Sequence, residues 1–268
     1  MRYFFESKVE KKDAGYTIQI PFNVWEVCHQ REGIKGDIVL DNNIIECELH
    51  PKEKGNYEIV ITDEAAVKVE LGVLHKILLH INGSLIRMDQ NSPYSFENPI
   101  RKIDSMNVII QPEDGLCGQA CVAMLAGVTI AEVISVMDCR EWQATMGRVI
   151  SALNYYGIDH TDIIVYTEGR PAVLPKCCIM MEKMGRFCHY LVHYDGKFYD
   201  SNLGVLEEYD MSKLLGYLRS SADGMQIPYL RDFDYLVLFI RKFKNCRLHR
   251  CAYSFFIANR LIGEKTPK

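Results

Sequence analysis

The stretch from Gln111 to Gly127, a loop that runs into an apolar segment, constrains the fold of this chain more than any other. Asp114 is a typical N-cap residue, which would place Cys117 in the first turn of a helix that ends at Gly127. A thiol in the first turn lies beside unpaired backbone N–H groups and the positive end of the helix dipole, and both favour the thiolate. We therefore predict that Cys117 is a nucleophile.

Residues 1–85 are predicted to form a small β-barrel domain. Tyr16–Phe22 alternates with period two, and turn signals at Asp41–Asn43 and Lys54–Asn56 separate short apolar runs. Asp63–Leu71 suits a short helix, and a last strand follows it. Several short strands with turns at close spacing are typical of a small barrel.

This N-terminal pattern also resembles a small bacterial β-barrel family of unknown function. In that family a strand pair around a Gly-rich turn is followed by a short helix and a closing strand. Val24–Leu49, Asp63–Leu71 and Leu74–Ile81 occupy those places here. The resemblance supplies no catalytic residue, and the barrel is a candidate surface for binding a protein partner.

Residues 86–105 read as a linker, and residues 106–268 as a second domain of α+β class. Three helices are expected after the one at Cys117: Thr129–Met137, Thr145–Tyr156 and Met211–Ser221. The expected strands are Met106–Ile110, Ile163–Tyr166, Cys177–Met181, Cys188–Tyr194, Gly196–Asp200 and Tyr235–Ile240, while Cys251–Leu261 fits either helix or strand. The turn Tyr194–Gly196 predicts a β-hairpin.

Composition narrows the class of protein. The net charge of -4 over 268 residues gives no support for nucleic-acid binding, and no apolar run is long enough to span a membrane. Charged residues interrupt the N-terminal segment within its first eight residues, so it does not read as a Sec-type signal peptide. Ten cysteines in apolar contexts indicate reduced, mostly buried thiols. We expect a cytoplasmic protein that needs no cofactor and no metal.

The residue types downstream of Cys117 suit thiol catalysis. A thiol hydrolase needs a histidine to hold the proton of the thiol, a group to orient that histidine, and donors for the oxyanion. His189 begins a strand, and Asp200 ends the next strand of the predicted hairpin. Gln111 lies six residues before Cys117 and could donate from its side-chain amide.

Alternatives remain for three of these roles. Gln111 could cap or bridge the loop backbone instead of serving the oxyanion. His193 lies four residues from His189 and would point to the same side of the strand. Asp195, at the turn, and Asn202 compete with Asp200 as the residue that orients the histidine. Cys121 lies one helical turn after Cys117, where core packing is the favoured interpretation over a zinc site, because the paired CxxC spacing is missing.

The pattern Gln111-x5-Cys117-Gly118-x2-Cys121 resembles the nucleophile motif of the bacteriocin-processing, double-glycine leader peptidases, a family of papain-like cysteine peptidases. The resemblance covers roughly residues 108–240 and implies an oxyanion role for Gln111, attack by Cys117, and a His–Asp pair at His189 and Asp200. It implies a papain-like cysteine peptidase domain preceded by the small β-barrel.

Members of that family that act in secretion are usually fused to a membrane exporter, whereas a β domain stands on the N-terminal side here. Leader cleavage is therefore one of several activities that the resemblance implies on a peptide or isopeptide bond. The rivals are an acyltransferase or deamidase that uses the same thioester chemistry, and a binding or scaffold protein on an inactive peptidase fold.

Several other chemistry-bearing residues are predicted to be structural. Trp142 and the aromatic run Tyr253, Phe255 and Phe256 are expected in the core, although an exposed aromatic in a groove is an alternative. Cys177 and Cys178 lie together in an apolar strand, where packing is favoured over redox chemistry.

Overall fold

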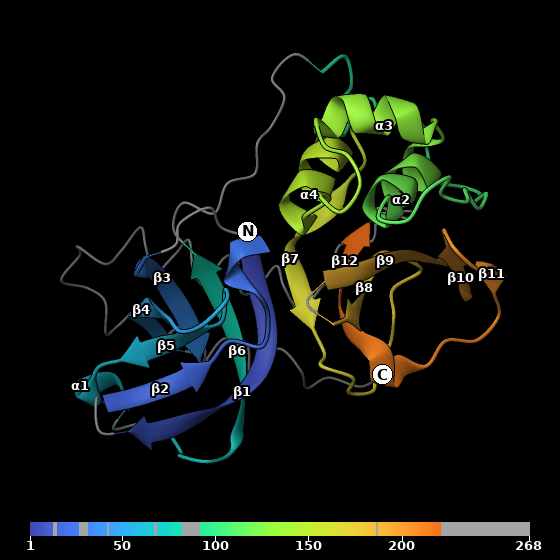
Figure 1. Cartoon of the computed structure of the whole chain (residues 1–268). Helices are drawn as coiled ribbons and strands as arrows, with labels where there is room; N and C mark the ends of the chain where they lie inside the picture. The colour runs from blue at the N-terminus through green and yellow to red at the C-terminus, as the bar shows by residue number, and fades with distance from the viewer. Residues whose placement is uncertain are drawn as a thin grey trace, which may run out of the picture. The chain divides into compact units, whose positions relative to one another are not determined.

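The computed structural model describes residues 1–12, 15–26, 32–41, 43–66, 69–81, 92–185 and 187–220, and the fold below is that of these residues (Figure 1). They belong to one unit that extends over residues 1–223. The predicted strand Tyr235–Ile240, the segment Cys251–Leu261 and its aromatic run lie outside the described residues.

Within the described residues, six strands close into an antiparallel barrel. They are β1 (Arg2–Lys12), β2 (Gly15–Gln19), β3 (Ile34–Leu40), β4 (Asn43–Pro51), β5 (Tyr57–Ile61) and β6 (Leu74–Ile81). Their order is β1-β2-β5-β4-β3-β6, and β6 pairs with β1 again to close the ring (Figure 1). The predicted N-terminal β-barrel is therefore confirmed.

Alternating side chains fill the barrel, because successive residues of a strand point to opposite faces. Tyr3, Phe5 and Val9 of β1 are fully buried. Gly36 lets β3 pass close to β6, since a Cβ there would come 2.7 Å from the carbonyl oxygen of His80. A short 3₁₀ turn (Val24–Glu26) and the helix α1 (Asp63–Ala66) complete the described part of the barrel, and α1 is shorter than the predicted helix.

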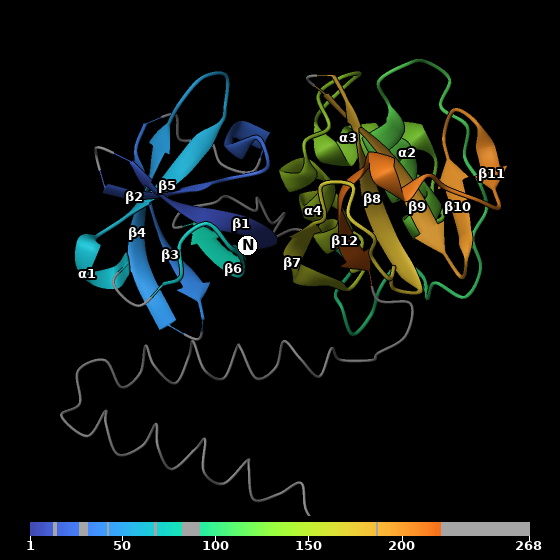
Figure 2. The same ribbon diagram turned by 90° about the horizontal axis from the view of Figure 1, so that it is seen from below.

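Three helices cover one face of a second group of strands (Figures 1 and 2). The helices are α2 (Cys117–Ala126), α3 (Ile130–Met137) and α4 (Met146–Tyr155). The strands are β7 (His160–Tyr166), β8 (Cys177–Met184), β9 (Phe187–Tyr194), β10 (Lys197–Asp200), β11 (Gly204–Leu206) and β12 (Leu214–Ser220), in the order β11-β10-β9-β8-β12-β7. Parallel pairing of β7 with β1 joins these strands to the barrel.

Local sequence signals set several boundaries as predicted. Thr129 caps α3 in a full capping box with Glu132. Gly127, in the left-handed region at φ 71°, ends α2. Asp195 and Gly196 both have positive φ, at 50° and 86°, which is the geometry of a two-residue hairpin turn between β9 and β10.

Two predictions of secondary structure are wrong. Residues 106–110 carry no strand, and the described part of the predicted helix Met211–Ser221, residues 211–220, is not an α-helix. After a 3₁₀ turn at Met211–Lys213, the chain continues as β12, whose side chains alternate in burial. β12 fills the gap between β7 and β8 and pairs with both, so sheet pairing overrides the helix preference of its leucines.

Candidate active site

Cys117 is the first residue of α2, as the sequence predicts, but Asp114 does not cap the helix. The N-cap is Leu116, and no side chain makes a cap hydrogen bond to the first turn. The side-chain oxygen of Gln111 instead accepts a hydrogen bond from the backbone N–H of Leu116 at 3.0 Å. The first-turn N–H groups therefore stay without side-chain caps next to the thiol, whose residue is 9% exposed.

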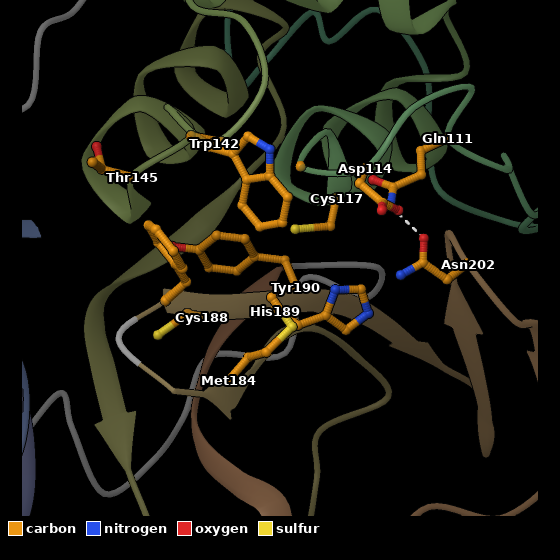
Figure 3. A pocket seen from close by; sticks show the side chains of 13 residues that line it. Gln111, Asp114, Cys117, Trp142, Thr145, Met184, Cys188, His189, Tyr190 and Asn202 are labelled. Carbon is orange, nitrogen blue, oxygen red and sulfur yellow. Dashed lines mark hydrogen bonds between the residues drawn. The ribbon is translucent and has the colours of Figure 1, made fainter.

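His189 and Asp200 form a buried hydrogen-bonded pair beside Cys117. His189 lies on β9, which packs against α2, and Asp200 is the last residue of β10. Nε2 of the imidazole donates to Oδ2 of Asp200 at 2.9 Å. Cys117 lines the same pocket as His189 (Figure 3), and its side chain also raises the pKa of the imidazole.

The charge state of the histidine follows from these contacts. Burial alone would lower the pKa of His189, but the hydrogen bonds to Asp200 and Cys117 outweigh burial and raise that pKa to about 10. Burial would likewise raise the pKa of Asp200, yet the imidazole and two backbone N–H groups hold it below its ordinary value. At neutral pH these contacts thus favour a protonated imidazole at His189 beside an ionised carboxylate at Asp200.

Gln111 reaches the same site from the loop before α2. Its backbone N–H donates to the carbonyl of Ser201 at 2.9 Å, and its side-chain nitrogen donates to Oδ1 of Asn202. The amide group thus lies at the edge of the pocket that also holds Cys117 and His189. The structure therefore brings together all four residues that the sequence singled out.

A pocket of about 300 Å³ opens over the sulfur. Its lining residues are Gln111, Asp114, Gly115, Cys117, Trp142, Ala144, Thr145, Met184, Phe187, Cys188, His189, Tyr190 and Asn202. Figure 3 shows Trp142 on one side of Cys117, with Gln111 and Asn202 on the other. The pocket can hold an acyl group with one apolar and one polar flank.

Trp142 is not in the core, which corrects the favoured prediction for this residue. It is 53% exposed, and its ring lies 5.4 Å from that of Phe187, centroid to centroid. Its backbone N–H donates to the carbonyl of Gly115 at 2.9 Å, and its φ of 60° is rare for a bulky residue. The loop after α3 thus presents an aromatic side chain to the pocket.

The alternative residues are engaged elsewhere. Nδ1 of His193 donates to the carbonyl of Pro175 at 2.8 Å, and its ring packs on Phe198. Asp195 occupies the hairpin turn. Cys121 is fully buried, and burial raises the pKa of its thiol well above the ordinary value. In the part of the chain that the structure describes, no group of three or more His, Cys, Asp or Glu side chains is arranged to hold a metal ion.

Sequence reasoning missed the role of Asn202. It is an alternative to Asp200 for orienting the histidine, but its side chain bonds Gln111. Its backbone N–H donates to Oδ1 of Asp200 at 2.7 Å, as does that of Leu203 at 3.2 Å. An Asp followed two residues later by Asn, just after a strand, is the one sequence signal that indicates such a turn.

The chain matches no protein-family model, and no curated protein is similar to it. Among the described residues, no single helix is long and apolar enough to cross a bilayer. Only α2 and α3 taken together have that length and composition, and the pair is bent by 109°.

Proposed function

We propose that this protein is a cysteine hydrolase that cleaves a peptide or isopeptide bond through Cys117, His189 and Asp200. The observation that carries the proposal is the position of His189, which donates a hydrogen bond to Asp200 and lines the same pocket as Cys117, whose side chain also raises the pKa of the imidazole. That arrangement supplies a nucleophile, a proton carrier and an orienting carboxylate in one chain of contacts.

In the proposed reaction, the thiolate of Cys117 attacks the carbonyl carbon of the substrate. The developing oxyanion accepts hydrogen bonds from the backbone N–H of Cys117 and the side-chain amide of Gln111. The imidazolium of His189 then gives its proton to the leaving amine, and a thioester remains on the sulfur. Water, deprotonated by the now neutral His189, hydrolyses the thioester and restores the thiolate.

We also propose a papain-like architecture for the part of the chain after the barrel. A helix that begins at the nucleophile packs on an antiparallel strand that bears the histidine, and the acid follows on the next strand. This order supports the resemblance to the bacteriocin-processing peptidases. The described cysteines are all free thiols, which suits the cytoplasm. The barrel is proposed as a docking module for a protein partner or substrate.

The test uses two small probes on the full-length protein. Iodoacetamide alkylates thiolates, and p-nitrophenyl acetate acylates them through a tetrahedral intermediate with release of nitrophenolate. We expect wild type to be alkylated at Cys117 first, as located by peptide mass mapping, and to give a burst of nitrophenolate. Cys117→Ala should lose the burst, while Cys188→Ala, in the same pocket, should keep it.

A matched pair of variants on β9 tests the histidine. His189→Asn should slow both probes by at least tenfold, because the thiolate loses its counter-ion. His193→Asn keeps a donor toward the carbonyl of Pro175 and should behave as wild type. Equal rates in the two variants, or a full burst from Cys117→Ala, would show that the proposed assignment is wrong.

A further inference from the structure

The side-chain amide of Gln111 is held at both of its ends. Its oxygen accepts a hydrogen bond from the backbone N–H of Leu116 at 3.0 Å, and its nitrogen donates to Oδ1 of Asn202 (Figure 3). Because a backbone N–H can only donate, the oxygen must face Leu116 and the nitrogen must face Asn202. The orientation of the amide is thereby fixed.

The amide nitrogen carries two N–H groups. One is taken by Asn202, and because the amide is planar, fixing this N–H also fixes the direction of the other. Gln111 lines the same pocket as Cys117, so we take the second N–H as the donor for the oxyanion. A donor that is already aimed before the reaction needs no reorganisation when negative charge develops, which is the main source of oxyanion stabilisation.

The backbone of Asn202 is held in turn by the carboxylate of Asp200. Oδ1 of Asp200 accepts from the backbone N–H groups of Asn202 and Leu203, whereas Oδ2 accepts from His189. The carbonyl of Ser201 also accepts from the backbone N–H of Gln111. The two oxygens of one carboxylate therefore serve the imidazole and the turn that carries Asn202.

We propose that Asn202 is a positioning residue, whose side-chain oxygen fixes the amide of Gln111 so that one N–H points at the oxyanion. This inference rests on the proposed cysteine-hydrolase function and assigns a further residue to it. Asn202 acts through Gln111 and leaves the attacking power of the thiolate unchanged, so its removal affects only reactions that pass through an oxyanion.

The two probes separate these effects. Alkylation by iodoacetamide displaces iodide without forming an oxyanion, whereas acylation by p-nitrophenyl acetate forms one. We expect Asn202→Ala to slow acylation about tenfold, a part of the roughly 10²–10³-fold cost of losing an oxyanion donor outright, and to leave alkylation unchanged. Asn202→Leu, which keeps the shape of the side chain without its oxygen, should give the same loss. Val205→Ala, three residues on in β11 and 43% exposed, should match wild type in both reactions.

A double-mutant cycle with Gln111→Ala decides whether Asn202 works through Gln111. In the Gln111→Ala background, Asn202→Ala should cause no further loss. A multiplicative loss, or an equal loss of alkylation and acylation, would overturn the positioning role. If Gln111→Ala acylates as fast as wild type while Cys117→Ala does not react, the oxyanion role of Gln111 fails and the positioning role with it, but the nucleophile stands.

Discussion

Gly118, the second residue of α2, lies directly against Ala144 in the loop before α4. A Cβ on Gly118 would come 2.6 Å from the Cβ of Ala144, which is closer than two such atoms approach. Its next neighbours, Tyr190 and Val149, would lie at ordinary contact distances of 3.4 and 3.5 Å. The methyl group of Ala144 thus explains why the residue after Cys117 has to be small.

Gly118→Ala should destabilise the protein and disturb the pocket. Pushing the loop away from α2 is an overpacking change, which costs about 1–3 kcal/mol of unfolding free energy. The pocket wall carried by this loop moves with it, so we also expect slower acylation of Cys117. Urea denaturation and the nitrophenyl ester burst measure the two effects.

Ala144→Gly provides the matched rescue. It removes the methyl group that the new Cβ meets, so the double variant should regain most of the lost stability and the burst. Alanine is favoured over glycine inside a helix by about 1 kcal/mol, so the helix propensity at position 118 does not itself predict a loss of stability. Additive losses in the double variant would show that the contact with Ala144 is not the cause.

Asp200→Asn should lower stability in a defined pH window. The pKa of His189 is raised, so its contribution is fully present below the ordinary histidine value and is lost as pH rises toward about 10. The pKa of Asp200 is lowered, so its contribution is present above the ordinary value and is lost in acid. The unfolding free energy that the variant loses, roughly 1.5–3 kcal/mol for a charged hydrogen bond, should therefore be largest between the ordinary pKa values of the two groups, from about pH 4 to about pH 6.5.

Thermal unfolding of wild type and Asp200→Asn from about pH 2 to about pH 10 would measure this difference, because the contribution of Asp200 is lost only below its ordinary pKa. The two curves should converge toward both ends of the range. Asp195→Asn is the control, because asparagine tolerates the positive φ of that turn and the carboxylate has no part in the site. A deficit that is constant with pH would mean that the ion pair with His189 is not its source.

At position 142, glycine should give a more stable protein than alanine, which is the reverse of the usual order, because the backbone of Trp142 has a positive φ. At φ 60° a residue with a Cβ carries about 1–3 kcal/mol of strain, which glycine does not. Trp142→Gly should thus be more stable than Trp142→Ala, by about 1 kcal/mol in urea denaturation, although both remove the ring. At Arg140, whose φ is not positive, alanine should be the more stable of the two replacements.

Local features of this fold could be predicted because neighbours within a few residues determine them. The capping box at Thr129 and the hairpin turn at Asp195 are of this kind. β12 could not be predicted, since its leucines and arginine favour a helix in isolation, and only pairing with β7 and β8 makes it a strand.

The same distinction applies to the site. Cys117, His189, Asp200 and Gln111 could be selected from their chemistry and from the elements that carry them. The bond between Gln111 and Asn202 joins loops 91 residues apart and depends on which way an amide points, which no local pattern encodes. The size and apolar ring of Trp142 predict a core position. The positive φ that turns the ring toward the pocket cannot be inferred from the residue type.

The place of β12 in the sheet has a consequence for synthesis on the ribosome. Leu218 pairs with Ile164 of β7 on one side and with Ile179 of β8 on the other. All four residues of the candidate site are translated before β12, yet β8 and β7 have no partner on their facing edges until it arrives. β12 therefore completes the sheet. A nascent chain contains all four site residues before β7 and β8 can be joined through β12.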